Sequence, residues 1–390
     1  MDLSSRQPLI NHDPGSRSCI SIHNPSAFNI NLCSQAATMG AKAVLVTGAN
    51  GYIGKAVACA FVRAGWVTYG LIRSVQSSIS LTAEEIIPII GSIDDVVSHK
   101  VIQALLPSTL DVIVSTTENT LDYVPHFQNI VSLLQTLSIS STANGVRPLV
   151  IFTAGSKDYG VGPHLSDDPG VAPHDELSEL RPPPFAAPRV QHAPRIFESI
   201  NAFAAVLVRP TNVYGRASSY YSVCFRAGSR AGSAENPRDR ILIAPTQPSW
   251  ICHSLHIDDC AEAYVAIASA PRQTVEGEVF NISSERYETA EQIINAIIKE
   301  YGIAGGVKYV NLKDVATDED ASLAMAIGFP QWTSSKKLRM ATGWTDHRLP
   351  FSDAFHIYRL SYEAAAQLRD ENVGKIGKTI NSLMSTIESV

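Results

Sequence analysis

Several features are scarce or missing in this sequence of 390 residues. It contains no run of basic residues, and its formal net charge of −6 argues against a surface for nucleic acid. Every long apolar stretch is interrupted by a polar residue, a glycine or a proline before it reaches the length of a membrane span. These absences predict a soluble protein whose partners include neither nucleic acid nor a membrane.

Cysteine is also sparse, because the six cysteines show no spacing of a disulfide framework. Without a secretory signal they are expected to be reduced thiols, which predicts a cytoplasmic protein. One stretch, from Cys252 to Cys260, gathers cysteine, histidine and aspartate. A strand leading into a helix that Asp258 caps explains this stretch better than a metal site, so we predict no metal.

The most informative stretch is a glycine-rich turn near residue 50. Four apolar residues at 43–46 predict a buried strand, and Gly48, Gly51 and Gly54 follow it at the spacing of a nucleotide-binding turn. The helix that begins near Tyr52 would present free N–H groups and its positive dipole end to phosphates. A second apolar strand follows that helix, and the whole unit therefore predicts dinucleotide binding.

The remainder of the chain alternates strands and helices and then changes character. Strands are expected near 43–47, 67–72, 86–90, 111–116 and 148–153, and this rhythm predicts a parallel sheet with helices on both faces. We expect an α/β fold, a doubly wound parallel Rossmann sheet with a smaller mixed C-terminal substrate lobe. The predicted parts are a disordered N-terminal tail at 1–38, a Rossmann domain at 39–215 with a proline-rich loop at 158–195, and a lobe at 216–390 from which 252–283 returns to the Rossmann domain.

Five motifs together resemble the extended short-chain dehydrogenase/reductases of the NAD-dependent epimerase/dehydratase group. They are Thr47 to Gly54, Gly91 to Asp94, Lys157 to Gly160, Arg209-Pro210 with Val213 to Gly215, and His256 to Asp259. The resemblance runs from about Lys42 to Ser283. It implies a Rossmann domain with a C-terminal substrate lobe.

The resemblance also implies where the dinucleotide binds. The residues expected to contact it are Thr47, Gly48, Asn50, Gly51, Tyr52, Ile53, Gly54, Arg73, Ser92, Ile93, Ser115, Thr116 and Thr117. An NAD enzyme usually has an acidic residue at the end of the second strand, where this chain has Ile72 followed by Arg73. A guanidinium can hold a 2′-phosphate, so NADP(H) is favoured, with NAD(H) as the alternative.

The catalytic pattern of the group is incomplete in this chain. Reaction in this group needs a serine or threonine, a tyrosine, and a lysine four residues after that tyrosine. The last hydroxyl position after the fifth strand falls on Gly155, and Thr153 and Ser156 flank it. The stretch 187–195, where the tyrosine and lysine are expected, contains no tyrosine, and Arg195 is the cation that could replace the lysine.

Two other side chains could supply the proton. One is His192, because an imidazole can donate and recover a proton, and the other is Tyr159, which follows the fifth strand. The candidate catalytic set is therefore Ser156, Thr153, Tyr159, His192 and Arg195.

Three functions remain open. The first is an NAD(P)-dependent oxidoreductase that reduces a small aldehyde or ketone with NADPH. The second is a sugar-type epimerase or dehydratase that uses transient hydride transfer. The third is a non-catalytic NADP-binding sensor or interaction module. The apolar helix expected at 122–138 could form a homodimer or pack within the chain.

Overall fold

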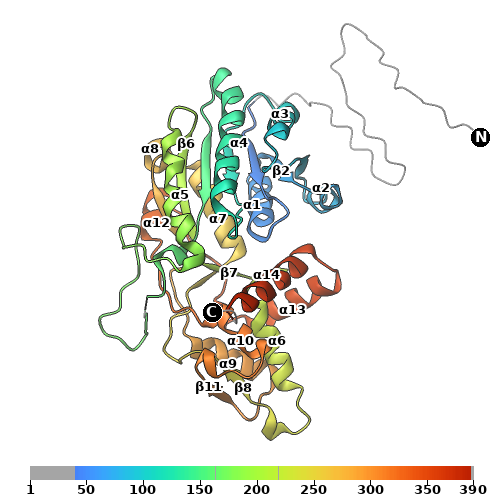
Figure 1. The fold of residues 1–390 in the computed structure, drawn as a ribbon, viewed down its shortest axis with the longest axis vertical. Coiled ribbons are helices and arrows are strands. Elements are labelled where there is room, and N and C mark those ends of the chain that lie inside the picture. The colour runs from blue at the N-terminus through green and yellow to red at the C-terminus, as the bar shows by residue number, and fades with distance from the viewer. Residues whose placement is uncertain (1–39, 163, 218, 388–390) are drawn as a thin grey trace, which may run out of the picture.

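The upper half of the molecule in Figure 1 is a parallel sheet covered by helices on both faces, and a smaller lobe lies below it. The structure is a computed structural model that describes residues 40–387 except 163 and 218. The predicted tail at 1–38 lies outside the described residues. The seven sheet strands stand in the order β10-β6-β5-β4-β1-β2-β3, and every neighbouring pair is parallel. The predicted doubly wound sheet is therefore confirmed.

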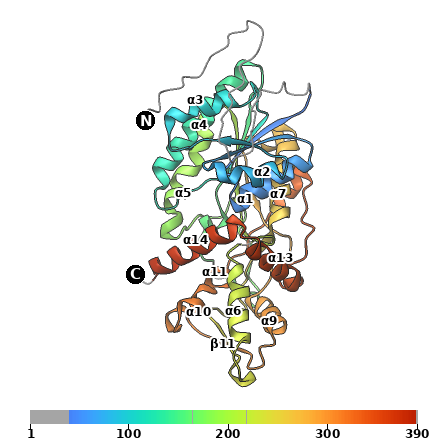
Figure 2. The same ribbon diagram turned by 90° about the vertical axis from the view of Figure 1, so that its right-hand side faces the viewer.

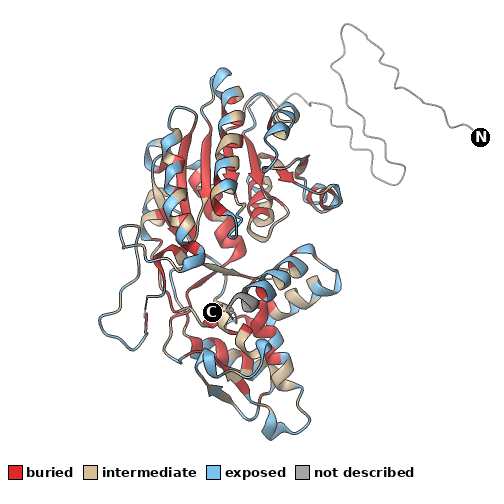
Figure 3. Cartoon of the chain, viewed as in Figure 1, coloured by how far each residue is buried: buried red, intermediate tan, exposed pale blue. Residues whose placement is uncertain are grey.

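The first five strands of the chain lie close to the expected positions, and β6 and β10 complete the sheet. Their bounds are Ala43–Thr47 for β1, Val67–Ile72 for β2, Ile87–Ile90 for β3, Val112–Ser115 for β4, Leu149–Thr153 for β5, Ala204–Pro210 for β6 and Val279–Ile282 for β10. Alternation within β1 divides the core in two. Val44 and Val46 pack on the side of α1 (Tyr52–Arg63) and α7 (Ile257–Ser269), whereas Leu45 packs with α4 (Tyr123–Ala143). Figure 3 shows the strands buried between these two helical layers.

The apolar face of α4 is used within the chain. Phe127, Ile130 and Leu134 belong to the core cluster formed with the sheet. The helices α3 (Val96–Leu105) and α5 (Ala187–His192) lie on either side of α4. Pairing of two chains through α4 stays a prediction.

The lobe contains short strands and helices around its own core. Aromatic residues dominate that core, and Phe351 touches Tyr214, Tyr221 and Phe225. The lobe elements are β7 (Asn212–Tyr214), α6 (Ser222–Gly232), β8 (Leu242–Ala244), β9 (Ser254–His256), α9 (Ala290–Tyr301), β11 (Val307–Tyr309), α10 (Asp318–Ser322) and α11 (Ala324–Ile327). The helix α12 (Lys336–Thr342) packs instead on the sheet domain, against β10 and α7 (Figure 1). Two further helices, α13 (Phe355–Gln367) and α14 (Glu371–Ile387), lie at the waist between the lobe and the sheet domain in both Figure 1 and Figure 2.

The expected cap of α7 is wrong in one detail. The residue at the N-cap is His256, whose Nδ1 accepts a hydrogen bond from the backbone N–H of Asp258 at 3.1 Å. Asp258 itself lies in the first turn of the helix, where it pairs with Arg216. An imidazole nitrogen can accept as an aspartate would, so the helix begins two residues earlier than the aspartate suggested.

Candidate functional site

The glycine turn between β1 and α1 is built for close approach. Gly48 has φ of +70°, a conformation that glycine adopts without strain. A Cβ atom on Gly54 would lie 2.2 Å from the carbonyl oxygen of Gly48 and 2.7 Å from Oγ1 of Thr116. Only glycine therefore lets α1 start directly against the turn.

The first turn of α1 leaves its backbone donors available. Gly51 is the N-cap, no side chain caps the helix, and its first turn contains no acidic residue. An N-terminus of this kind attracts an anion, because its N–H groups lack partners within the helix. This geometry fits a pyrophosphate at Gly51, Tyr52 and Ile53, as the sequence predicts.

Two buried hydroxyls at neighbouring strand ends lack partners. Thr47 ends β1 and Ser115 ends β4, the two residues pair in the sheet register, and neither Oγ atom makes a hydrogen bond within the described chain. Buried polar atoms are rarely left unpaired, so these hydroxyls fit a ligand that brings polar groups to this edge. Beside them, Thr116 Oγ1 donates to the Thr47 carbonyl at 2.6 Å, and Thr117 Oγ1 lies 3.2 Å from His126. The residues of this edge therefore fit a dinucleotide.

The adenosine side of the predicted site lies at the ends of β2 and β3. Arg73 directly follows β2, is exposed, and makes no ion pair with any described residue. Ser92 and Ile93 follow β3, and Ile93 is buried. A role for these three residues in binding the adenosine half stays a prediction.

The predicted catalytic corner, the turn after β5 with the side chains that cover Gly155, is organised around Arg189, a residue outside the predicted catalytic set. A Cβ atom on Gly155 would lie 3.3 Å from the Arg189 guanidinium, so this side chain covers the position where a hydroxyl was expected. Arg189 donates to Asp158 and to Glu118, each at 2.7 Å. All three groups meet at the ends of strands and helices that are distant in sequence.

Burial and pairing set the charges of this corner. Burial opposes the charged form of Arg189, yet Glu118 and Asp158 raise its pKa, so it stays cationic. Burial also raises the pKa of Asp158, and Arg189 and Arg209 oppose that shift. The carboxyl is held between two arginines, because Arg209 Nε lies 3.5 Å from its second oxygen.

The structure does not bring Arg195 into this corner. Its side chain is 51% exposed and pairs with Glu198 one helical turn away at 3.2 Å. The cation at Gly155 is Arg189, and the residue four positions before it is Phe185. The two positions expected to hold the tyrosine and the lysine therefore correspond to Phe185 and Arg189. In the sequence this pair is visible as an aromatic residue followed four positions later by a cation. Phe185 is 45% exposed and has no hydroxyl.

The other predicted catalytic hydroxyls are mostly engaged elsewhere. Tyr159 is buried, donates to Asn281 at 2.9 Å and accepts from Arg209 at 3.2 Å. The hydroxyl of Thr153 lies 2.9 Å from that of Tyr264 on α7.

Ser156 and His192 differ from these two. The hydroxyl of Ser156 has no hydrogen-bond partner among the described residues, although the residue is buried. The ring of His192 packs near Phe127, with 6.1 Å between the ring centroids. Of the five predicted residues, Ser156 is thus the one in the β5 turn that keeps a hydroxyl for a ligand.

Lys157 is a second unpaired group in the same turn. Its ammonium lies 3.6 Å from the ring centroid of Phe329 and pairs with no carboxylate in the described chain. Burial lowers its pKa to about 8, and the nearby charge of Arg189 acts in the same direction. A lysine with this pKa can both take up and release a proton near neutral pH.

The cysteine and histidine stretch forms structural contacts. Nδ1 of His253 accepts from the backbone of Thr333 at 3.2 Å, and its Nε2 lies 3.1 Å from the Ser284 carbonyl. Cys252 and Cys260 are buried, and burial raises the pKa of both thiols. Over the described ranges, no group of three or more histidine, cysteine or acidic side chains could hold a metal ion.

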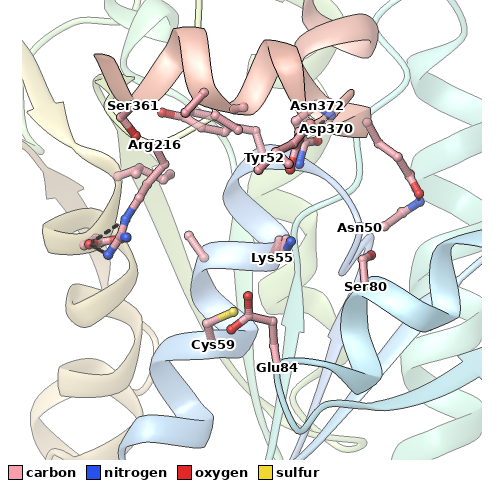
Figure 4. Close-up of a pocket in the computed structure, with 18 of the residues that line it drawn as sticks. Asn50, Tyr52, Lys55, Cys59, Ser80, Glu84, Arg216, Ser361, Asp370 and Asn372 are labelled. Atoms are coloured by element: carbon pink, nitrogen blue, oxygen red, sulfur yellow. Dashed lines mark hydrogen bonds and ion pairs between the residues drawn. The ribbon is translucent and has the colours of Figure 1, made fainter. Parts of the chain in front are cut away.

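A cavity of about 600 Å³ lies beside the glycine turn, between α1 and the α13–α14 pair (Figure 4). Lys55 and Cys59 of α1 and Glu84 line its lower wall, and Asp370 and Asn372 lie on the opposite side in the figure. The cavity reaches Asn50 and Tyr52, so the start of α14 borders the predicted dinucleotide site.

Comparison with known families and structures supports this geometry. The family described as the NAD dependent epimerase/dehydratase family matches residues 44–283. No curated protein matches the chain significantly. Helices long and apolar enough to cross a bilayer are absent from residues 40–387, leaving aside 163 and 218.

Solved structures with the same fold are distant in sequence. The UDP-glucuronic acid 4-epimerase from Bacillus cereus in complex with NAD is 17% identical, with 82% of this chain and 96% of that chain covered and a TM-score of 0.59. The UDP-glucose 4-epimerase from Thermotoga maritima with UDP-glucose is 15% identical, with coverages of 83% and 99% and a TM-score of 0.61. The corresponding epimerase from Bifidobacterium longum, in complex with NAD+ and UDP, is 15% identical, with coverages of 85% and 100% and a TM-score of 0.59. At such identities the likeness establishes the fold.

Proposed function

The chain belongs to the NAD-dependent epimerase/dehydratase family, and from this membership we propose that it is a nicotinamide-dependent enzyme for a small sugar-like substrate. The proposed reaction is an epimerisation or dehydration that proceeds by transient hydride transfer. The observation that carries the proposal is the turn at Gly48 to Gly54, where any Cβ on Gly54 would collide with the turn, together with the unpaired hydroxyls of Thr47 and Ser115.

Reduction of a small carbonyl with NADPH, the first function expected from the sequence, is not supported. The three solved structures compared above are described as epimerases, and those from Bacillus cereus and Bifidobacterium longum contain NAD or NAD+. The epimerase alternative therefore replaces it. The expected preference for NADP(H) likewise has no support beyond Arg73.

The cofactor residues divide into two groups. The N–H groups of Tyr52 and Ile53 would bind the pyrophosphate, and the hydroxyls of Thr47 and Ser115 would face the nicotinamide half. A bound nicotinamide ring supplies a reversible hydride acceptor. Gly48 keeps the turn close enough for backbone donors to reach the ligand.

On the substrate side, we assign two roles to the turn after β5. Ser156 would hold the substrate oxygen with its free hydroxyl, and Arg189 would add positive charge beside it. Lys157 would take the proton of the substrate hydroxyl and later return it, a role that Phe185 cannot fill. The neutral amine is the form that accepts a proton, so activity should rise with pH to a plateau above about 8.

The test uses purified protein, NAD+ and a panel of UDP-sugars, with product epimers separated by chromatography. Lys157→Met should lose at least about 100-fold in turnover, because general acid–base catalysis contributes ~10²–10⁴-fold. Its affinity for NAD+ should not change. Lys299→Met, in which an exposed lysine of α9 is replaced, is the matched control.

Two results would count against the assignment. Equal turnover of Lys157→Met and Lys299→Met would remove Lys157 from proton transfer. Binding of NAD+ without conversion of any UDP-sugar or free sugar would instead favour the second candidate function, a dinucleotide-binding module without turnover.

The observation that favours this second function is the pair of missing hydroxyls at Gly155 and Phe185. The double substitution Gly155→Ser with Phe185→Tyr restores both groups. If the wild-type chain is a binding module, the double variant gains an activity that the wild type lacks. If the wild type is an enzyme that uses Lys157, the wild-type chain is already active without the two substitutions.

A further inference from the structure

The first turn of α14 brings a carboxylate to the glycine turn. Glu371 accepts hydrogen bonds from Nδ2 of Asn50 at 3.4 Å and from Oγ of Ser77 at 2.9 Å. Asn50 also donates to Ser77 at 3.0 Å, which closes a triangle of three side chains. Lys375 donates to Glu371 at 2.8 Å and to the Asn50 carbonyl at 3.0 Å. These contacts join segments 321 residues apart in sequence.

The rest of α14 holds this turn in place. Ile380 is 1% exposed and packs in the lobe core, with Ile376 beside it. The chain enters the helix through Asp370, whose carboxylate accepts from the backbone of Asn372 at 2.8 Å. The helix therefore spans from the lobe to the sheet domain, and Glu371 is held from both sides.

The position of Glu371 corresponds to the adenosine ribose of a bound dinucleotide. The proposed pyrophosphate site is the turn after β1, and the family resemblance implies that the adenine lies near Ser92 and Ile93, after β3. Because β2 lies between β1 and β3 in the sheet, the ribose that joins the two groups lies near the end of β2. Asn50 belongs to the turn after β1 and Ser77 to the segment after β2, so a carboxylate bonded to both would lie beside the ribose of a dinucleotide bound in this way.

We propose that Glu371 binds the adenosine ribose hydroxyls and gives the chain a preference for NAD(H) over NADP(H). The proposal rests on the dinucleotide binding proposed above. The end of β2 lacks the acidic side chain that usually accepts hydrogen bonds from the ribose hydroxyls, because that strand ends in Ile72. The proposal assigns this role to Glu371 of the C-terminal helix α14. A carboxylate accepts two ribose hydroxyls well and repels a 2′-phosphate.

The charge of Glu371 agrees with this role. Burial opposes its ionisation, but hydrogen bonds from Lys375, Ser77 and Asn50 hold its pKa below the ordinary value. The group is therefore anionic at neutral pH. Two cations act in the opposite sense, because the exposed Arg73 and the ammonium of Lys375, 2.8 Å from Glu371, would each attract a 2′-phosphate. The preference for NAD(H) therefore requires that Glu371 contacts the ribose directly.

The experiment measures binding by calorimetry with four probes: NAD+, NADP+, ADP-ribose and 2′-phospho-ADP-ribose. The last two isolate the adenosine half, so the readout does not depend on turnover. The variants are Glu371→Gln, which keeps the size of the side chain, and Glu371→Asp, which withdraws the carboxylate by one methylene. Glu363→Gln, on α13 and paired with Arg359, is the matched control.

We expect wild type and Glu363→Gln to bind NAD+ and ADP-ribose more tightly than the 2′-phosphorylated probes. Glu371→Gln should weaken NAD+ and ADP-ribose about tenfold or more, the size expected for hydrogen bonds to a charged group, without weakening the phosphorylated probes. Glu371→Asp should show a smaller loss in the same direction.

Three results would overturn the proposal. An unchanged NAD+ affinity in Glu371→Gln would show that the carboxylate does not contact the ribose. Tighter binding of all four probes would show that it obstructs the site. Failure of the wild type to bind any probe would refute the proposed function as well. That result is distinguished from the other two because it is observed in the unsubstituted protein.

Discussion

Replacing Arg189 tests whether the catalytic corner depends on a buried charge network. In Arg189→Met the carboxylate of Asp158, which is 2% exposed, loses two contacts with the guanidinium at 2.7 Å. Removing one partner of a buried ion pair costs about 3–5 kcal/mol. Arg209 remains at 3.5 Å and Glu118 is 35% exposed, so water and Arg209 offset part of the loss. We expect a decrease of about 3 kcal/mol in the free energy of unfolding at pH 7.5.

The pH dependence of this decrease identifies its cause. Burial already raises the pKa of Asp158, and loss of Arg189 removes the largest influence opposing that shift. A carboxyl whose folded pKa lies above its unfolded value stabilises the fold at low pH and loses that contribution as pH rises through the folded pKa. The variant should therefore approach the wild type in stability as the pH falls from 7.5 toward 5.

Urea denaturation at several pH values is the measurement, and Arg195→Met is the control. That arginine is exposed and has one pair along its own helix, so its replacement should cost less than about 1 kcal/mol. Equal stability of the two variants at pH 7.5, or a deficit in Arg189→Met that persists unchanged in acid, would refute the argument.

Three other predictions concern single features. Gly54→Ala should lower the free energy of unfolding by at least about 1–3 kcal/mol and abolish NAD+ binding, because the new Cβ would lie 2.2 Å from the carbonyl oxygen of Gly48. The control is Gly374→Ala, whose Cβ would have no neighbour within contact distance, and it should be neutral or stabilising in the same urea titration. Burial lowers the pKa of His253 and His174 to about 4, so stability followed by urea titration should fall as pH drops from about 6.5 toward 4, and a flat profile would contradict this. Partial burial and Glu84 raise the pKa of Cys59 to about 11, so its alkylation at pH 8, followed by mass spectrometry, should be roughly a hundredfold slower than in urea; equal rates would contradict a raised pKa of this half-buried thiol.

The sequence alone was sufficient for the sheet, because the information is local. Four apolar residues before Gly48 predict a buried strand, and the spacing to Gly54 predicts the turn and helix that follow. Each of these features depends on neighbours within a few residues, and the structure has them at the expected positions.

The catalytic corner was only partly predictable. The missing hydroxyl at Gly155 is visible in the sequence, but the stretch 187–195 has no tyrosine to mark the position of the cation, and Arg195 was predicted in place of Arg189. Which arginine faces Gly155 depends on the course of the chain from the proline-rich loop into α5. Hydrophobic periodicity and turn residues do not predict that course. An aromatic residue four positions before a cation, as in Phe185 and Arg189, was the available signal.

Tertiary structure alone decided the surroundings of Glu371, the proposed ribose-binding residue. Nothing near Glu371 in the sequence suggests a nucleotide site, because that site is formed by Asn50 and Ser77 at the other end of the chain. Strand and helix patterns arise from contacts between near neighbours. The contact between Glu371 and Asn50, which lie 321 residues apart in sequence, depends instead on the packing of α14 between the lobe and the sheet domain. Only the folded chain specifies that packing.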